Sequence, residues 1–414
     1  MTTPHATHQL ATNPATMCVG HASAAAFWLS DHWPEQPSWA PVAEPVLLPS
    51  PSDARQAAAQ VDARLIMPPG VRGVRTHVLA DGKAHNSLDD VVVLHNWQSS
   101  LPAGSFVRLA PGLYMATPAL TVVMAAQYLS VPEVAELITA LYARYCIGAD
   151  GRQARRATPV LTPDELERYL DSLDPSTPGL KKARQAMKLA RVGAESPKEA
   201  AISVVMVTSQ PLGGGGLDKL ELNRAFVVDG RSRAFISTRT VRFDGCVPTG
   251  SYSRQKATVA YDFDSVTYHA RGYSALGSGA PGEKDGLLDE RDYINHDSRR
   301  RSGADEMGVD LVTLTTDDVA DPRQFFAKVD QLRRKCGLTG LRPTREAWLR
   351  RRRLHDTMLS SLRFMLRLEE RFERAIQVSS HKRSVGRAAA TKVRPKLCRA
   401  RILVCEFWSR DVAA

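Results

Sequence analysis

From residue 196 to about residue 335, helical and strand-like patterns follow one another in an order that few folds accommodate. The periodicity predicts a helix, three strands, a second helix, a fourth strand and a last helix. These elements cover residues 196–208, 223–229, 234–246, 257–262, 289–307, 309–315 and a helix from about 322. Hairpin-linked strands followed by a crossover helix predict a mixed sheet. We therefore expect residues 193–340 to form an α/β (α+β) domain, with about four strands flanked by helices.

Two Gly-rich stretches interrupt this pattern. Residues 213–216 lack the Lys-Ser/Thr that follows a phosphate-binding loop, which favours a flexible connection between elements. Residues 263–288, full of Gly and Ser, predict an exposed loop.

Three helix starts are predicted by the same capping pattern, a Ser or Thr followed three residues later by Glu. The pairs are Ser130 with Glu133, Thr162 with Glu165, and Ser196 with Glu199. Pro111-Gly112 lies between two short apolar runs and predicts a hairpin over residues 105–120. We expect residues 61–192 to form a hairpin plus a mostly helical domain. Residues 1–60, rich in Pro, Ala, Ser and Thr, hold no sustained period and predict a loosely ordered arm.

The net charge of +11 is concentrated at the C-terminus. From Pro343 onward there are 18 Lys and Arg against 7 Asp and Glu, while the rest of the chain has 37 of each kind. Residues 341–414 therefore predict a basic helix and an unassigned tail. Such a segment either holds phosphates without reading sequence or is simply solvated. The run Arg350 to Arg353 points around the whole helix, so solvation is its commoner use.

Several classes of protein are disfavoured by what the sequence lacks. No run approaches the ~18 apolar residues of a membrane span, and the N-terminus has no signal-peptide pattern, so we expect a cytoplasmic protein. The six cysteines show no CxxC pair, which predicts reduced thiols rather than a zinc site or disulfides. No dinucleotide fingerprint or catalytic Ser elbow is present, and no small-molecule cofactor is expected.

Short motifs within residues 196–335 carry a resemblance to a known superfamily. They are SPKEA at 196, VRFDGCVP at 241, TVAYDFDS at 258, His269, HDSRRRSGADEMG at 296 and VDLVTLTTDDVADP at 309. In order and spacing they resemble the very-short-patch-repair-like branch of the restriction-endonuclease-like, PD-(D/E)xK, superfamily, as found in actinobacterial proteins. The upstream stretch FVRLAPGLYMATPALTVVMAAQYLSVPEVAELI at 106 is similar to the same proteins, and more loosely to the antitoxin component of abortive-infection systems.

The resemblance implies metal-assisted hydrolysis of DNA, in which carboxylates from separate elements share one Mg²⁺ or Mn²⁺. By resemblance, Glu199, Asp244 and Asp262 are the metal ligands and His269 a fourth catalytic residue. The resemblance also directs Arg300, with its neighbours Arg299 and Arg301, toward DNA phosphate. The family usually has Glu where this chain has Ala260, and an alanine cannot ligate a metal.

Each candidate also has a purely structural interpretation. Glu199 fits a capping box, and Asp244 precedes a Gly where Asp often completes a turn. A His in a Gly-rich loop is commonly an ordinary surface residue. Asp297 with Arg300 and Arg301 has the spacing of surface ion pairs. Asp262, an acid between apolar strand residues, needs a partner and is the best single candidate; Asp264, two residues on, is a possible replacement ligand or the start of a loop.

Three functional hypotheses follow. The first is a divalent-metal-dependent DNA endonuclease with a degraded site. The second is a nuclease-like fold that no longer cuts and serves as a DNA-binding or antitoxin-type regulator. The third is a protein whose basic tail binds an acidic protein partner.

Overall fold

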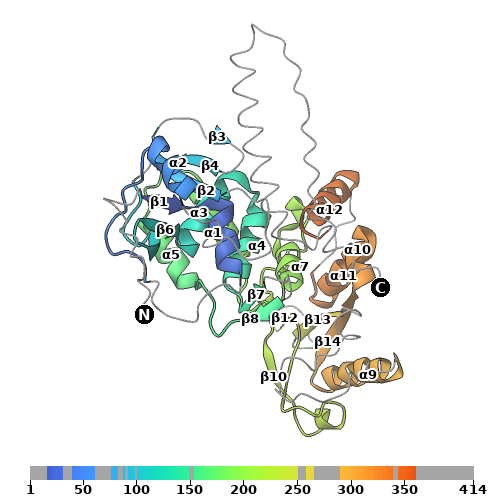
Figure 1. Ribbon diagram of the computed structural model, residues 1–414. Helices are drawn as coiled ribbons and strands as arrows, with labels where there is room; N and C mark the ends of the chain where they lie inside the picture. Colours follow the sequence, from blue (N-terminus) through green and yellow to red (C-terminus); the bar gives the residue numbers. More distant parts are fainter. Residues whose placement is uncertain are drawn as a thin grey trace, which may run out of the picture. The chain divides into compact units, whose positions relative to one another are not determined.

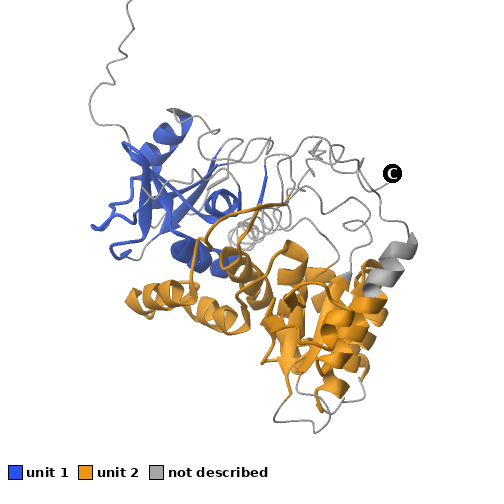
Figure 2. Ribbon diagram, turned by 90° about the horizontal axis from the view of Figure 1, so that it is seen from below, with its two compact units in different colours: residues 1–128, 147–152, 365–414 blue, residues 129–146, 153–364 orange. Residues whose placement is uncertain are grey.

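The computed structural model describes residues 16–30, 40–60, 76–82, 87–88, 92–97, 100–148, 153–249, 258–264, 290–338 and 344–359. The chain divides into two compact units (Figure 2). The first comprises residues 1–128, 147–152 and 365–414, and the second residues 129–146 and 153–364. In the described part of the chain, no helix is long and apolar enough to cross a membrane.

The first unit is built on a six-stranded mixed sheet with strand order β3-β4-β2-β1-β6-β5. Its elements are β1 (Met17–Val19), α1 (His21–Leu29), α2 (Pro51–Gln60), β2 (Thr76–Asp81), β3 (Ser87–Leu88), β4 (Val92–Trp97), β5 (Phe106–Ala110), β6 (Leu113–Ala116) and α3 (Pro118–Tyr128). The hairpin predicted around Pro111-Gly112 is present as β5 and β6, and Gly112 has the positive φ of 76° that its turn requires.

The N-terminal segment differs from the loosely ordered arm that composition predicts. Its strand β1 lies in the middle of the sheet, antiparallel to β2 and parallel to β6. Helix α1 follows directly, and all nine of its residues are buried. A helix that is apolar all round has no polar face, so it shows no amphipathic period in the sequence. Of the predicted domain 61–192, the residues up to 128 contribute β2 to β6 to this sheet, whereas residues 129–146 and 153–192 belong to the second unit.

Three buried histidines meet inside the first unit. His21 opens α1 with a φ of 49°, and its ring stacks on that of His95 with the ring centroids 3.6 Å apart. His77 Nδ1 and His95 Nε2 are 2.8 Å apart and share a hydrogen bond. All three side chains are at most 1% exposed. They come from α1, β2 and β4, so the stack joins the helix to two strands of the sheet.

The second unit combines the upstream helices with a four-stranded sheet (Figure 1). Its elements are α4 (Val131–Leu141), α5 (Pro163–Ser172), α6 (Leu180–Leu189), α7 (Pro197–Val207), η2 (Gln210–Leu212), β9 (Glu221–Leu222), β10 (Ala225–Val227), η3 (Ser232–Ala234), β11 (Thr240–Arg242), β12 (Gly245–Pro248), β13 (Thr258–Asp264), α9 (Glu290–Glu306), β14 (Val309–Thr315), α10 (Thr316–Ala320), α11 (Pro322–Lys335) and α12 (Arg345–Met358). Strands β7 (Tyr145–Ile147) and β8 (Gln153–Arg155) form a separate two-stranded sheet.

The four-stranded sheet is mixed, as predicted, with strand order β14-β13-β12-β9. Strands β9, β12 and β13 pair antiparallel, whereas β13 and β14 pair parallel and are connected through α9. Successive side chains of a strand point to opposite faces. Val309 and Leu311 pack in the cluster that includes Ala304 of α9, while Asp310 pairs with Lys335 of α11. Helices α9 and α11 therefore cover opposite faces of this sheet.

The predicted helix starts are present in the structure. Thr162 and Ser196 accept hydrogen bonds from the third backbone amide of their helices, and Ser130 heads a complete capping box. The Gly-rich stretch at 213–216 is not a flexible connection, because a Cβ at Gly214 would lie 2.0 Å from the carbonyl oxygen of Thr208. This loop is packed backbone to backbone against the end of α7.

The basic region after residue 341 is described only as far as Leu359, which closes α12. Within it Arg351 is buried and makes a two-point ion pair with Asp330 of α11, at 2.7 and 2.8 Å. This arginine holds α12 against α11 and is not solvated. The other three arginines of the run, Arg350, Arg352 and Arg353, are exposed.

Candidate functional site

Two carboxylates predicted to share a site lie side by side at the end of the β12–β13 pair. Asp244 immediately precedes β12, and Asp262 lies on β13. The backbone amide of Asp244 donates to Asp262 Oδ1 at 3.2 Å, and the amide of Phe263 donates to Asp244 Oδ2 at 2.6 Å. These two bonds continue the antiparallel β12–β13 pairing beyond Gly245, with carboxylate oxygens as the acceptors in place of backbone carbonyls. Together with Glu199, these residues are called the acidic cluster below.

Glu199 occupies the first turn of α7 and is nearly buried. Its Oε2 accepts from the amide of Glu195 at 2.9 Å and from Asn223 Nδ2 at 2.7 Å, while its Oε1 accepts from Ser196 Oγ at 2.9 Å. The side chain thus turns back to its own helix terminus, as the capping interpretation predicts. Its carboxylate accepts from the backbone amide of Glu195, the residue before the N-cap, and not from the amide of the N-cap residue Ser196.

The carboxylates are close enough to alter one another's protonation. Burial raises the pKa of Asp244 well above its ordinary value, and the charges of Glu199 and Asp262 raise it further. The Phe263 amide and the Arg300 guanidinium oppose this rise. Burial likewise raises the pKa of Glu199, against the hydrogen bonds it accepts. Protons are therefore held in the acidic cluster at pH values where exposed carboxyls are ionised.

Arg300 of α9 neutralises one member of the acidic cluster. Its Nε lies 2.6 Å from Asp262 Oδ2, and its Nη2 lies 3.1 Å from Asp262 Oδ1. Nη2 also donates to the carbonyl oxygen of Arg242, and the guanidinium lies 5.2 Å from the Phe243 ring centroid. Arg300 therefore differs from both expectations. It is not an exposed phosphate contact, and its ion-pair partner Asp262 lies on β13 and not on its own helix. Of its neighbours, Arg301 donates to Thr313 Oγ1 and Arg299 is exposed.

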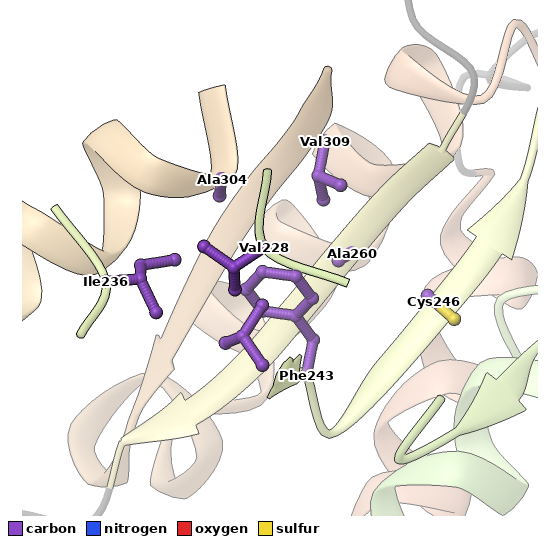
Figure 3. Packing of buried hydrophobic residues seen from close by; sticks show 8 residues of the cluster. Val228, Ile236, Phe243, Cys246, Ala260, Ala304 and Val309 are labelled. Atoms are coloured by element: carbon purple, nitrogen blue, oxygen red, sulfur yellow. The ribbon is translucent and has the colours of Figure 1, made fainter. Parts of the chain in front are cut away.

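Ala260 lies deep in an apolar cluster (Figure 3). It is fully buried, and its cluster includes Phe243, Ala304 of α9 and Val309. The face it shares with Asp262 is covered at this point by α9. A carboxylate placed here would enter hydrocarbon surroundings.

Three residues near the acidic cluster were not predicted from the sequence to belong to a site. Asn223, with a φ of 49°, bridges the carbonyl oxygen of Gly193 and Glu199 Oε2. Gly245 lets the Tyr261 ring pass, because a Cβ there would lie 2.2 Å from Tyr261 Cε1. Lys198 places its Nζ 4.1 Å from the Phe263 ring centroid, and burial lowers its pKa to about 8. Of the three, only Asn223 could have been singled out from the sequence, because Asn is a residue type that tolerates positive φ.

The side chains present do not fit a magnesium or manganese site. Such a cation takes oxygen ligands that point to one centre, mostly from ionised carboxylates. Asp262 has both oxygens bound by Arg300, and Glu199 has both oxygens bound by protein donors. Across the described residues, no three His, Cys, Asp or Glu side chains are grouped so as to hold a metal ion. His269 and the side chain of Asp264 lie outside the described residues.

A scan of protein-family models finds no match to this chain, and neither the curated proteins nor the solved structures contain one that matches it. The restriction-endonuclease-like resemblance therefore stays a prediction. The structure itself shows the mixed sheet with helices on both faces, and it shows Asp244 next to Asp262.

Proposed function

We propose that this protein binds DNA through a nuclease-like α/β domain whose acidic cluster serves as a structural element and does not cut. The observation that carries the proposal is the two-point pairing of Asp262 with Arg300. A carboxylate held in this way has its charge neutralised and its oxygens directed at a guanidinium. The same arginine bonds the backbone of Arg242, so the ion pair ties α9 to the strand that leads into Asp244.

Exposed arginines on residues 224–242 and on α9 support the choice of DNA as partner. Arg224, Arg231, Arg233, Arg239, Arg242 and Arg299 are all exposed. Exposed guanidinium groups attract the phosphate backbone irrespective of base sequence.

The alternative is a metal-dependent endonuclease, and one observation favours it. The three acids lie close enough to raise the pKa of Asp244, and a divalent cation, like a proton, relieves repulsion among carboxylates. For this alternative Asp262 would have to exchange Arg300 for the cation.

Two assays on the full-length protein separate the proposals. We expect a fluorescent 20-base-pair duplex to bind in the presence of EDTA, with affinity that falls as salt rises. We expect supercoiled plasmid to remain intact with Mg²⁺ or Mn²⁺. Nicked or linear products from the wild type, absent with Asp244→Asn, would replace the proposal with the endonuclease. Absence of duplex binding at low salt would remove DNA as the partner.

A further inference from the structure

The segment from Arg224 to Arg242, called the arm below, leaves the sheet after β9 and returns just before Asp244. It comprises β10, η3 and β11, and β10 pairs with β11 in a two-stranded sheet of their own. Figure 1 shows it projecting from the second unit beside α9. The arm contains five Arg, no Lys and a single acid, Asp229.

The arm is anchored on one side. Val228, Ile236 and Val241 are buried in the apolar cluster with Phe243 and Ala304 of α9. The contact with α9 is close, because a Cβ at Gly303 would lie 2.5 Å from Ile236 Cδ1. A segment held in this way presents its outward side chains from a fixed backbone, which lowers the entropy lost when a ligand binds.

Its outward side is basic. The five arginines, Arg224, Arg231, Arg233, Arg239 and Arg242, are all exposed. The carboxylate of Asp229 is engaged locally: its Oδ1 accepts from the amides of Arg231 and Ser232 and from Ser232 Oγ. Arg242 and Arg224 have exposed acidic neighbours, Glu195 and Glu221, each at 3.3 Å. Within the described residues no carboxylate lies at ion-pair distance from Arg233, Arg239 or Arg299.

Two features suit a nucleic-acid backbone. Every cation of the arm is an arginine, whose planar fork matches phosphate oxygens with two parallel hydrogen bonds. Val227 and Phe235, exposed by 80% and 39%, lie among these arginines and offer apolar contact to sugars and bases. The arm also ends two residues before Asp244.

We propose that the arm is the DNA-binding surface of the second unit, holding the phosphate backbone of a duplex through Arg231, Arg233 and Arg239. This inference rests on the proposed function and adds the surface that performs it. It differs from the sequence-based expectation, which directed Arg299, Arg300 and Arg301 toward phosphate and left the basic C-terminal region either phosphate-binding or solvated. Of these residues, Arg300 forms an ion pair with Asp262.

A charge-matched pair of triple variants tests this. The arm variant is Arg231→Gln, Arg233→Gln and Arg239→Gln; the control is Arg345→Gln, Arg350→Gln and Arg353→Gln on α12, three arginines that are also exposed. Binding of the 20-base-pair duplex is measured by fluorescence anisotropy over a salt series with the full chain. Circular dichroism and thermal melting check that both variants fold.

Each phosphate contact contributes about 0.9 to the slope of log K against log salt concentration. We expect the arm variant to lose about 2 to 3 from this slope and the control to lose less than about 1. A wild type that binds DNA alongside an arm variant with an unchanged slope, or equal losses in both variants, would overturn the arm and leave the proposed function standing. A wild type that does not bind DNA would overturn both.

Discussion

Arg300 places a cation directly on one carboxylate of the acidic cluster. Without it, the acidic cluster would hold three carboxylates with no opposing side-chain charge bonded to them. With it, Asp262 is neutralised by two hydrogen bonds, and the rise in the pKa of Asp244 is partly offset. Removing either member of this partly buried ion pair leaves the other charge without its partner.

Replacement of Ala260 by Glu is the change that the predicted restriction-endonuclease-like resemblance suggests, and we expect it to destabilise the fold. The new carboxylate would lie among Phe243, Ala304 and Val309. An uncompensated buried charge costs about 3 to 5 kcal/mol. Urea unfolding measures the loss, and Ala225→Glu, at an exposed strand position, is the matched control with an effect of less than about 0.5 kcal/mol. An Ala260→Glu protein that is as stable as the wild type and nicks DNA would show that this position belongs to an active site.

Among the elements, those with a strong local signal were predicted well. The strand at Val309–Thr315 has the bounds that the run VDLVTLT predicts, and α9 begins and ends within one residue of the predicted helix. The predicted strand 234–246 is instead η3, β11, a bend at Asp244 and β12. In this stretch Ile236 reaches the core from a helical turn, so apolar residues appear without a strand.

The acidic cluster was predictable only in part for a similar reason. The order of Glu199, Asp244 and Asp262 along the chain suggested that they meet. The bonds that determine their chemical state come from Asn223, which lies 24 residues from Glu199, and from Arg300, which lies 38 residues from Asp262. Such partners depend on sheet register and on how α9 packs, and neither is encoded by a local period.

The loop at 213–216 gives a prediction about an element rather than a site. Gly214→Ala places a Cβ against the carbonyl oxygen of Thr208, a backbone atom that can move only if the end of α7 moves. We expect a loss of about 2 kcal/mol in the free energy of unfolding, within the range for overpacked sites. Gly230→Ala is the control, because its Cβ would meet nothing within 4 Å. Equal stability of the two variants in urea unfolding would mean that the loop is loose, as its composition suggested.

At the scale of the whole molecule, the first unit shows why segments of low periodicity cannot be dismissed. Strand β1 pairs with β2 and with β6, which are about 60 and 95 residues further along the chain. Three residues with the sequence MCV give no reliable strand signal by themselves. Their place in the centre of the sheet is decided by long-range pairing.

The two units contain buried titratable groups of opposite kind. In the first, burial and neighbouring imidazoles lower the pKa of His21 and His95 well below the ordinary value. The unfolded chain then binds protons below about pH 6.5 that the folded unit does not, so stability falls as pH falls, by about 1.4 kcal/mol per pH unit for each histidine. In the second, the pKa values of Asp244 and Glu199 are raised, so their contribution to stability is present at low pH and is lost as pH rises through the raised values.

Acidification from pH 7.0 to 5.5 is therefore expected to weaken the first unit while it preserves or strengthens the second. Hydrogen exchange of the full chain, followed by mass spectrometry and corrected for intrinsic rates, reads the two units separately. Protection in β2 and β4 should fall, and protection in β12 and β13 should hold or rise. His21→Asn, which tolerates the φ of 49° and does not titrate, should reduce the pH dependence in β2 and β4 alone. A parallel loss of protection in all four strands would show that the buried histidines and carboxyls do not govern the response to acid.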